Sequence, residues 1–389
     1  MKETGSMIVL GSTGSVGTQA LDVAKREGRR VKAVSANRDV KQVEEQVRFF
    51  GCKACAMADE NAAKELKIKL ADTSAKVFSG ADGINDMIFE SDAEFALNSI
   101  IGEAGLMPTV SSLESGKRLA LANKESLVVA GEIVMGLAHD KGIDIRPVDS
   151  EHCAVYQCLH AGRHEDIKKL ILTASGGPFY GKKRSELEKI TPADALAHPT
   201  WSMGQKITID SATMMNKGFE VIEAAHLFGV SADKIEVVVQ RESIIHSMVE
   251  YVDNSIIAQM SVPDMRLCVQ YALSSPARNE AVIDELDFGR MTQISFGKPD
   301  VETFVLLRTA LDCLRLGGAM GAVLNAANEV AVSAFLSEKI GFTDIFDCVT
   351  DTVSSLTERK NVHDLDGILD ADREARSKAL AFVNSIKRK

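Results

Sequence analysis

The amino-acid sequence is poor in cysteine and contains no long hydrophobic run. Seven cysteines in 389 residues are an odd number spread over a long chain, which argues against the disulfide framework of an extracellular protein. No segment approaches the ~18 consecutive apolar residues that a membrane-spanning helix needs. Residues 1–10 also lack the hydrophobic core of a secretory signal. We therefore expect a protein of the reducing cytoplasm that does not bind a membrane.

Positive charge is also scarce, because 45 Lys and Arg residues stand against 55 Asp and Glu residues and the formal net charge is −10. A nucleic-acid partner is not expected, since proteins that bind nucleic acids usually present a basic face. Hydrophobic residues make up 45% and charged residues 26% of the chain, which excludes a disordered or collagen-like protein. A length of 389 residues is typical of two or three globular domains.

Short apolar segments alternate with helical segments over the first 149 residues. This order is typical of right-handed β-α-β crossovers in an α/β fold. Residues 1–149 are therefore predicted to form one Rossmann-like domain with a doubly wound parallel sheet. The expected strands are residues 7–10, 31–35, 54–57, 95–99, 118–122 and 144–148, and the expected helices include 17–27, 40–50 and 125–141.

The pattern changes after residue 149. Residues 150–277 combine strand-like alternation with helices and are predicted to form a central α+β catalytic domain. Residues 278–300 are predicted to be an irregular linker, and residues 301–389 show helical spacing that predicts a C-terminal helical domain. The strands expected in the α+β domain are 170–173, 235–240, 246–252 and 256–260, with helices around 153–160 and 213–228.

A glycine-rich turn, GSTGSVG at residues 11–17, follows the first expected strand. Such a turn lets the backbone approach a pyrophosphate, and the following helix offers free N–H groups at its N-terminus. The spacing is a variant of the dinucleotide-binding motif, and a turn without a ligand is the alternative. After the second expected strand, Arg38 takes the place of the acidic residue of NAD-binding proteins. NADP is therefore favoured over NAD, unless Arg38 is an ordinary solvated side chain.

Two carboxylates follow the last strand expected in the N-terminal domain. Asp149 and Glu151 flank Ser150, and residues two apart in an extended chain project to the same face. They lie at the carboxyl end of a strand, where open α/β sheets bind ligands, and oxygen-rich sites suit Mg²⁺ or Mn²⁺ better than Zn²⁺. The pattern predicts a metal site, and an ordinary helix N-cap is the alternative.

A second polar cluster is predicted in DSATMMNKGFE, residues 210–220. Asn216 and Glu220 are four residues apart and are therefore neighbours on one helical face, with Ser211 and Lys217 nearby. A hydroxyl, an amide, a lysine and a helix N-terminus suit a phosphate group, and Glu220 can complete the carboxylate set of the metal site. The alternative is a capped amphipathic helix without a ligand.

Two segments rich in small residues are candidates for loops around a ligand. TASGGP, residues 173–178, can present Ser175 and backbone N–H groups to an anion, unless it is only a turn. HPTWSMG, residues 198–204, contains the only tryptophan of the chain, Trp201. Its Pro and Gly residues predict an active-site lid, and a buried Trp201 anchor is the alternative.

Taken in order, these segments resemble the 1-deoxy-D-xylulose 5-phosphate reductoisomerases, the NADPH-dependent enzymes of the non-mevalonate isoprenoid pathway. The resemblance extends over nearly the whole chain and is specific because the motifs occur as an ordered set. It implies an oxidoreductase and isomerase that converts 1-deoxy-D-xylulose 5-phosphate into 2-C-methyl-D-erythritol 4-phosphate, and it implies a homodimer. The matching segments are GSTGSVG, ALANKES, PVDSEH, TASGGPF, HPTWSMG, DSATMMNKGFEVIEA and NAANEVAVSAFL.

The resemblance also implies roles for individual residues. Lys124, Glu151 and His198 would take part in catalysis. The ligands of Mg²⁺ or Mn²⁺ would be Asp149, Glu151 and Glu220. The NADPH contacts would be Thr13, Gly14, Ser15, Val16, Ala36, Asn37, Arg38, Asn123, Glu125 and Gly204, and the contacts to the phosphorylated sugar would be Lys124, Ser150, Glu151, Ser175, His198, Trp201, Ser211, Asn216, Lys217 and Glu220.

Two other functions fit part of the pattern. Another NADP-dependent two-domain dehydrogenase, of the semialdehyde or homoserine type, shares the glycine-rich N-terminal domain but needs no carboxylate cluster. The second alternative is a dinucleotide-sensing protein without enzymatic activity. This function gives no role to the polar residues Lys124, Asp149, Glu151 and Glu220. The reductoisomerase is therefore the main expectation.

Overall fold

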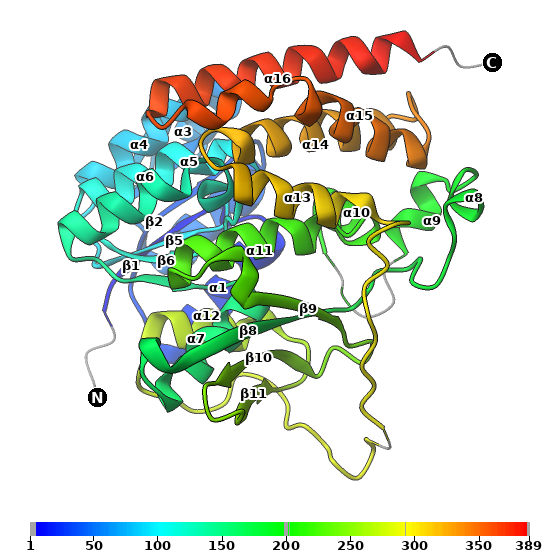
Figure 1. Cartoon of the computed structure of the whole chain (residues 1–389). Helices are drawn as coiled ribbons and strands as arrows, with labels where there is room; N and C mark the ends of the chain where they lie inside the picture. Colours follow the sequence, from blue (N-terminus) through cyan, green and yellow to red (C-terminus); the bar gives the residue numbers. More distant parts are fainter. Residues whose placement is uncertain (1–4, 198–200, 202, 292, 387–389) are drawn as a thin grey trace. The chain divides into compact units, whose positions relative to one another are not determined.

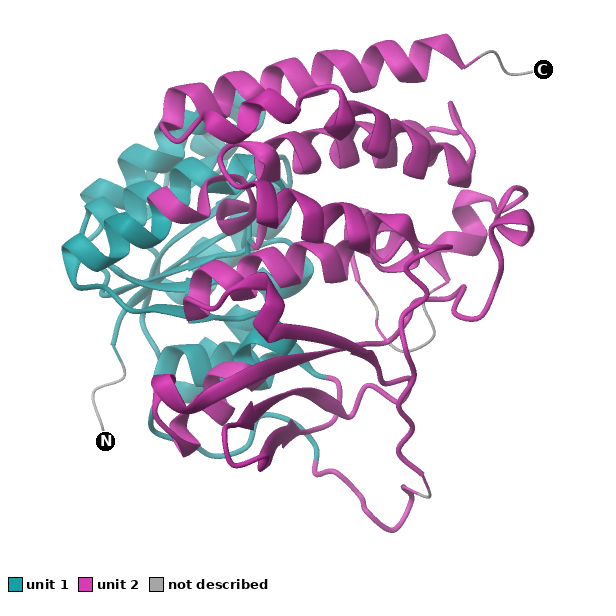
Figure 2. Cartoon of the chain, in the orientation of Figure 1, with its two compact units in different colours: residues 1–123, 134–153, 264–284 teal, residues 124–133, 154–263, 285–389 magenta. Residues whose placement is uncertain are grey.

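The computed structural model describes residues 5–197, 201, 203–291 and 293–386. Within these ranges the chain folds into two compact units, each formed by segments that are far apart in the sequence (Figure 2). Of the described residues, unit 1 contains those of 1–123, 134–153 and 264–284, and unit 2 contains those of 124–133, 154–263 and 285–389.

Unit 1 is built around a parallel sheet. Its strands are β1 (Met7–Leu10), β2 (Val31–Ala36), β3 (Ala54–Met57), β4 (Lys76–Ser79), β5 (Phe95–Asn98), β6 (Arg118–Leu121) and β7 (Ile145–Pro147). Among the described residues they form one seven-stranded sheet in the order β4-β3-β2-β1-β5-β6-β7, with every neighbouring pair parallel. The strand order reverses at β1, so the sheet is doubly wound and its ligand edge is the carboxyl end of the strands.

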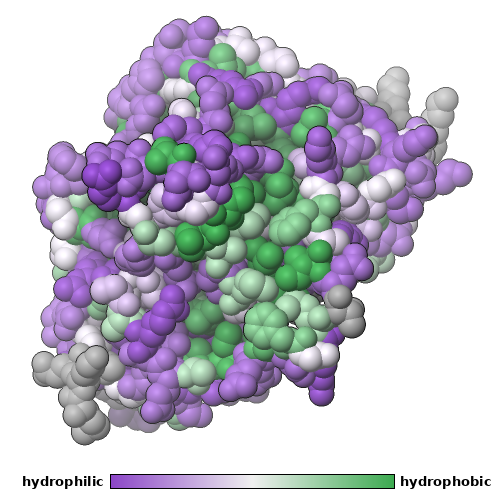
Figure 3. Space-filling view, turned by 60° about the horizontal axis from the view of Figure 1, so that its bottom comes forward, coloured by the Kyte–Doolittle hydropathy of each residue, from purple (hydrophilic) through white to green (hydrophobic). Residues whose placement is uncertain are grey.

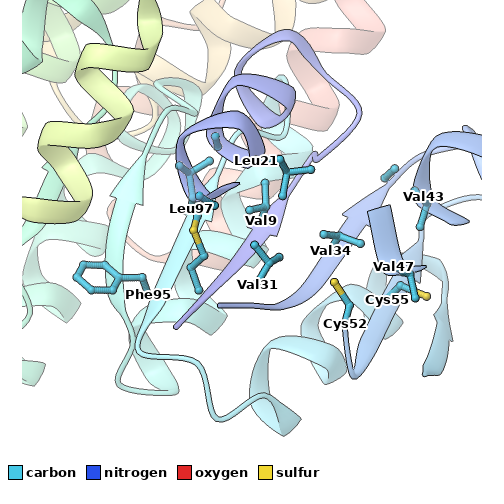
Figure 4. Close-up of a cluster of buried hydrophobic side chains, with 14 of the residues drawn as sticks. Val9, Leu21, Val31, Val34, Val43, Val47, Cys52, Cys55, Phe95 and Leu97 are labelled. Carbon is cyan, nitrogen blue, oxygen red and sulfur yellow. The ribbon is translucent and has the colours of Figure 1, made fainter. Parts of the chain in front are cut away.

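Helices cover this sheet: α1 (Ser15–Glu27), α2 (Val40–Phe50), α3 (Glu60–Lys69) and α12 (Met265–Ser274) share a hydrophobic cluster on one face. α4 (Gly80–Glu90) and α5 (Leu106–Glu114) lie in Figure 1 on the side of the strands opposite α1 and α12. On the first face, Val9, Leu21, Val43 and Leu97 belong to one buried hydrophobic cluster (Figure 4). α12 joins this cluster through Val269, although it follows the strands of unit 2 in the sequence.

Unit 2 contains a second sheet. Its strands are β8 (Ile167–Ala174), β9 (Ile235–Val239), β10 (Ile245–Tyr251) and β11 (Ile256–Met260). In the described part of the unit they form a sheet in the order β11-β10-β8-β9, in which β8 and β9 are parallel and the other pairs are antiparallel. β8 is therefore an inner strand, and the segment that follows Ala174 leaves the sheet between β9 and β10.

The helix α11 (Met215–Phe228) lies in Figure 1 between this sheet and the C-terminal helices of unit 2. Gly218 of α11 packs closely on α13, because a Cβ at this position would lie 2.6 Å from the Cβ of Ala310. The other helices of unit 2 are α8 (Arg184–Leu187), α9 (Pro192–Leu196), α10 (Gln205–Ala212), α13 (Val305–Leu316), α14 (Met320–Leu336), α15 (Phe342–Ser354) and α16 (Leu365–Ser385).

Two helices run from one unit into the other, α6 (Glu125–Lys141) and α7 (Ser150–Cys158). α6 is kinked at Ala130, whose φ of −139° and ψ of 38° are not helical. The kink lies shortly before the chain passes from unit 2 back into unit 1. In the part of the chain that the structure describes, every helix is too short or too polar to cross a bilayer.

The predicted fold class is confirmed by these elements. The strands expected in both sheets are present, with ends that differ from the predicted ones by at most three residues, and residues after 301 are largely helical. The sequence pattern does not predict β4, because only Phe78 of its four residues is buried. It also does not predict α12, which belongs to unit 1. The division into domains 1–149, 150–277 and 301–389 with a linker at 278–300 stays a prediction.

Candidate active site

The glycine-rich turn connects β1 to α1 at the carboxyl edge of the sheet of unit 1. Gly11 has a φ of 79°, and a Cβ at this position would lie 2.8 Å from the carbonyl oxygen of Ser99, so only glycine fits. A Cβ on Gly17 would collide with the carbonyl oxygen of Gly11, and this third glycine therefore lets α1 pack close to the strand. The intervening residues 13–16 form the tip of the turn and the first turn of α1, whose N–H groups have no helical partners.

Arg38 lies just after β2 at the same edge of unit 1. Its Nε lies 3.0 Å from Oδ2 of Asp59, and 77% of its side chain is exposed. The N–H group of Ala62 is the largest cause that lowers the pKa of Asp59, and the guanidinium of Arg38 adds to it. Ala36 ends β2 and Asn37 follows it. The edge thus presents an exposed guanidinium that an anionic group can reach.

Asn123 supports the loop that follows β5. Its Nδ2 donates to the carbonyl oxygen of Ile100 at 2.7 Å and to that of Gly102 at 2.9 Å. Asn98, at the end of β5, donates to the carbonyl oxygen of Gly105 at 2.9 Å. Two buried amides therefore fix the backbone at this part of the carboxyl edge, which holds the predicted cofactor-binding face in one conformation.

The predicted metal carboxylates of unit 1 lie at the start of α7. Oδ1 of Asp149 accepts a hydrogen bond from the N–H of Glu151 at 3.0 Å and lies 3.0 Å from Nδ1 of His152. The hydroxyl of Ser150 donates to Oε2 of Glu151 at 2.6 Å. Asp149 therefore caps the N-terminus of α7, as the simpler alternative predicts. A carboxylate has several acceptor positions, so the capping role is compatible with a role as a metal ligand.

Four residues of unit 2, Lys124, Asn216, Lys217 and Glu220, form what we call the Glu220 cluster. Nζ of Lys124 donates to Oε1 of Glu220 at 2.9 Å and to Oδ1 of Asn216 at 2.8 Å. Nδ2 of Asn216 donates to the same carboxylate oxygen at 2.5 Å, and Lys217 donates to the other oxygen. Both lysines and Glu220 are buried. The two ammonium groups hold the carboxylate of Glu220 in place and supply positive charge in this part of unit 2, which suits an anionic substrate.

The loop that follows β8 lies beside Ser211 in unit 2. Gly176 and Gly177 have φ values of 77° and 66°, and a Cβ on Gly177 would lie 2.7 Å from the carbonyl oxygen of Ser211. The N–H of Gly177 donates to Oγ of Ser175 at 3.2 Å. Because Ser211 lies in the helix that precedes α11, the structure brings the loop of Ser175 next to the segment that carries the Glu220 cluster.

The described part of the predicted lid contains Trp201, whereas His198 lies outside the described residues. The ring of Trp201 meets that of His246 edge-on, with 6.1 Å between the centroids. His246 belongs to β10, and its carbonyl oxygen accepts a hydrogen bond from the hydroxyl of Thr173 in β8 at 2.7 Å. Trp201 therefore packs against the strand pair that leads to the loop of Ser175. Gly204 is the N-cap residue of α10.

A buried ionic cluster around Lys206 is not predicted by the sequence pattern. Nζ of Lys206 donates to Oε1 of Glu125 at 2.7 Å and lies 3.0 Å from Oδ2 of Asp210, and Nδ2 of Asn328 donates to Oδ1 of Asp210 at 2.7 Å. Burial acts to raise the pKa of Glu125, but the charge and hydrogen bond of Lys206, together with the charge of Lys124, outweigh it and the pKa is lowered. Glu125 follows Lys124 in the sequence and Asp210 precedes Ser211. Through Asn328 of α14, the cluster connects both of these residues to that helix. Within this cluster, only the spacing of four residues between Lys206 and Asp210 predicts a contact from the sequence.

Two features define the class of this protein. Unit 1 has a doubly wound parallel sheet with a dinucleotide-binding turn, and unit 2 has a buried lysine–carboxylate cluster and a glycine-rich loop that packs on Ser211. This combination places the chain among the dinucleotide-dependent oxidoreductases.

Comparison with known families identifies the particular member of this class. The model of 1-deoxy-D-xylulose 5-phosphate reductoisomerase matches residues 7–131, and two models of the C-terminal domains of this enzyme match residues 145–228 and 260–378. These matches cover most of the sequence. The chain belongs to the 1-deoxy-D-xylulose 5-phosphate reductoisomerase family.

Individual relatives support this assignment over nearly their full length. The reductoisomerases of Thermoanaerobacter pseudethanolicus and Ruminiclostridium cellulolyticum are 48% and 47% identical to the chain, over 96% of this chain and 97% and 98% of theirs. The reductoisomerase of Zymomonas mobilis in complex with NADPH has a TM-score of 0.91 at 41% identity, over 98% of this chain and 100% of that chain. A DOX-P reductoisomerase in complex with NADPH, fosmidomycin and magnesium has a TM-score of 0.92 at 37% identity, over 98% of each chain.

Proposed function

We propose that this chain converts 1-deoxy-D-xylulose 5-phosphate into 2-C-methyl-D-erythritol 4-phosphate with NADPH and a divalent metal ion, Mg²⁺ or Mn²⁺. The observation that carries the proposal is the Glu220 cluster, because it joins two buried ammonium groups to a carboxylate within two segments that match the family. Solved relatives bind NADPH and magnesium, which supports the choice of cofactors.

The proposed metal ligands are Asp149, Glu151 and Glu220. Their chemistry fits a hard divalent cation, since all three offer carboxylate oxygens. When bound, the metal would act as a Lewis acid on the ketone and hydroxyl oxygens of the substrate. Glu151, whose carboxylate accepts a hydrogen bond from Ser150, is the proposed group for moving a proton.

The residues of unit 2 would bind and orient the phosphorylated sugar. We assign its phosphate to the hydroxyls of Ser175 and Ser211 and to the side chains of Asn216 and Lys217, which together supply hydrogen-bond donors and one positive charge. Lys124 would stabilise negative charge on the reacting oxygens. Trp201 would cover the substrate and exclude water, and His198 is proposed as a further catalytic group.

NADPH would bind along the carboxyl edge of the sheet of unit 1. Residues 13–16 would hold its pyrophosphate and residues 36–38 its 2′-phosphate, with Asn123, Glu125 and Gly204 completing the site. When bound, NADPH supplies the hydride that reduces the aldehyde formed by rearrangement of the carbon skeleton. The free N–H groups at the start of α1 and the exposed guanidinium of Arg38 support this placement.

For Arg38, we expect the substitution Arg38→Ala to reduce the preference for NADPH over NADH. Loss of one charge-assisted contact should raise the KM for NADPH about tenfold and leave that for NADH nearly unchanged. Steady-state kinetics with both cofactors measure the ratio. Arg48→Ala is the matched control, since Arg48 is also exposed in unit 1 and pairs with Asp72 and Glu44. An unchanged ratio in the Arg38 variant would remove this residue from the cofactor site.

We also propose that the protein is a homodimer. The edge strand β11 exposes Ile256 and Ile257, which are 51% and 37% exposed, and Val252 nearby is 62% exposed. Figure 3 turns this side of the molecule forward and shows hydrophobic residues gathered on it. An exposed hydrophobic edge strand favours association with a second copy. Sedimentation should give a mass about twice the 42.0 kDa of the chain, and a monomer at assay concentrations would contradict the proposal.

The cysteines support the proposed reducing compartment, the cytoplasm. All seven lie within the described ranges, where they are buried and form no disulfide. Burial raises the pKa of Cys52 and of Cys55 to about 12, so this C-x-x-C pair lacks the reactive thiolate of a redox motif.

An assay of NADPH oxidation separates the proposed function from its alternatives. We expect oxidation with 1-deoxy-D-xylulose 5-phosphate and Mg²⁺, and none with amino-acid semialdehydes. Activity on a semialdehyde alone would favour the other dehydrogenases. NADPH binding without turnover of either substrate would favour a dinucleotide sensor.

A further inference from the structure

Arg241 belongs to none of the residue sets assigned above, yet it contacts the loop of Ser175. It lies in the turn between β9 and β10, and its Nη1 donates to the carbonyl oxygen of Gly177 at 2.9 Å and to that of Ser175 at 3.1 Å. Its guanidinium lies over the ring of Tyr180, 5.3 Å from the centroid. One cationic side chain therefore bonds both ends of the loop and packs on the aromatic residue that follows it.

The loop requires such support because of its sequence. Gly176 and Gly177 both adopt positive φ angles, and glycine loses more conformational freedom on ordering than any other residue. β8 ends at Ala174, so the ladder of the sheet does not extend to the loop. Its two bonds to Arg241 hold the carbonyl groups at residues 175 and 177 in fixed directions.

The turn that carries Arg241 is itself held by hydrogen bonds within unit 2. Val239 and Gly297 exchange two backbone hydrogen bonds of 2.8 Å, just before Arg241. Just after it, Glu242 accepts a hydrogen bond from the hydroxyl of Ser295 at 2.6 Å. The turn between β9 and β10 is thus bound on both sides of Arg241, which makes it a firm support for the loop.

The two hydrogen bonds from Arg241 also change how the loop of Ser175 interacts with a phosphate group. The carbonyl oxygens of Ser175 and Gly177 carry partial negative charge that repels a phosphate, and Arg241 neutralises both by donating to them. The N–H of Gly177 in turn holds Oγ of Ser175, and the loop packs on the backbone of Ser211. Arg241 therefore offsets the repulsion that these two carbonyl oxygens would exert on a phosphate.

We propose that Arg241 is a positioning residue for substrate recognition, which fixes the loop of Ser175 so that it binds the phosphate of the sugar. This inference rests on the proposed function, because it deepens the role given there to Ser175 and Ser211. Arg241 acts through the loop and is not itself assigned a contact with the substrate.

The test is the substitution Arg241→Met, which keeps the apolar stem over Tyr180 and removes the guanidinium. The KM for 1-deoxy-D-xylulose 5-phosphate and the inhibition constant of inorganic phosphate should each rise about tenfold, which corresponds to about 1.4 kcal/mol. The kcat, the KM for NADPH and the Tm should stay close to those of the wild type, since the side chain is exposed. Arg241→Lys keeps the charge and should restore part of the phosphate affinity.

Arg184→Met is the matched control. Arg184 is another surface arginine of unit 2 that lies over an aromatic ring, that of Phe346 at 5.4 Å, and pairs with Asp347. This variant should leave every constant unchanged, which separates a local effect from a general loss of positive charge.

Unchanged KM and phosphate inhibition in Arg241→Met would overturn the inference. An equal loss in kcat and in NADPH affinity would also overturn it, because it would indicate a merely structural role. If the wild-type chain shows no turnover, calorimetric titration with inorganic phosphate still decides. Weaker binding by the variant supports the role of Arg241 even though the proposed reaction has failed, and equal binding rejects it.

Discussion

Replacing Glu220 with glutamine should lower kcat by about 10³-fold, while the Kd for NADPH stays within about twofold of the wild type. The change removes the carboxylate that accepts hydrogen bonds from Lys124, Asn216 and Lys217, and it removes one of three proposed metal ligands. NADPH binding is spared because most of its proposed contacts belong to unit 1. Turnover and a fluorescence titration with NADPH measure the two effects.

The folded state of this variant has to be checked, because removing one partner of a buried ion pair costs about 3–5 kcal/mol. Circular dichroism should show native secondary structure at the assay temperature. Glu236→Gln is the control, since Glu236 also pairs with a lysine in unit 2, but at an exposed position on β9. A Glu220→Gln enzyme with normal turnover would show that Glu220 is not part of the active site.

The second large effect is expected for Lys124→Met, which should lower kcat by about 10²-fold or more with a smaller change in the KM for the sugar. Methionine keeps the apolar body of the side chain but removes the charge that lies 2.9 Å from Oε1 of Glu220. The positive charge that we assign to the reacting oxygens is then lost. Steady-state kinetics at saturating NADPH measure the change.

Lys117→Met provides a comparison for Lys124. Lys117 is also buried, but it lies in unit 1 and its Nζ donates to Oγ of Ser115. Burial lowers the pKa of Lys117, so its substitution tests the cost of removing a buried lysine outside the site. We expect unchanged kcat in this variant. A decrease in Lys124→Met of less than tenfold, or one matched by Lys117→Met, would refute the role of Lys124.

Much of the fold follows from local sequence patterns. Short apolar strands such as Met7–Leu10 are buried on both faces, and the turns that follow them carry glycine where a Cβ would collide. The kink at Ala130 is not predicted, because residues 125–141 contain no proline that would mark it. β4 is not predicted because an edge strand with one buried residue has almost no periodic signal.

The site is predictable where its residues lie close together in the sequence. Asn216, Lys217 and Glu220 share one helix, and their neighbourhood follows from helical spacing. The contacts of Lys124 with Glu220, of Asn328 with Asp210 and of Arg241 with the loop depend on tertiary packing over long separations in the chain. No local pattern encodes such pairs, so the sequence identifies their members only through resemblance, or not at all.

The charge distribution reconciles an acidic protein with anionic ligands. The formal net charge is −10, yet the Glu220 cluster pairs two ammonium groups with one carboxylate. Arg38 adds a second local positive charge at the edge of unit 1. Binding of phosphate groups therefore depends on these local charges, which is why single substitutions there are expected to have large effects.

The most direct test of the proposed reaction is to identify the product that the chain forms from 1-deoxy-D-xylulose 5-phosphate, NADPH and Mg²⁺, and to repeat the reaction after removal of the metal with a chelator. We predict 2-C-methyl-D-erythritol 4-phosphate in an amount equal to the NADPH oxidised, none after chelation, and full recovery with added Mg²⁺ or Mn²⁺. NADPH oxidation without this product, or undiminished product formation in the chelated enzyme, would contradict the account.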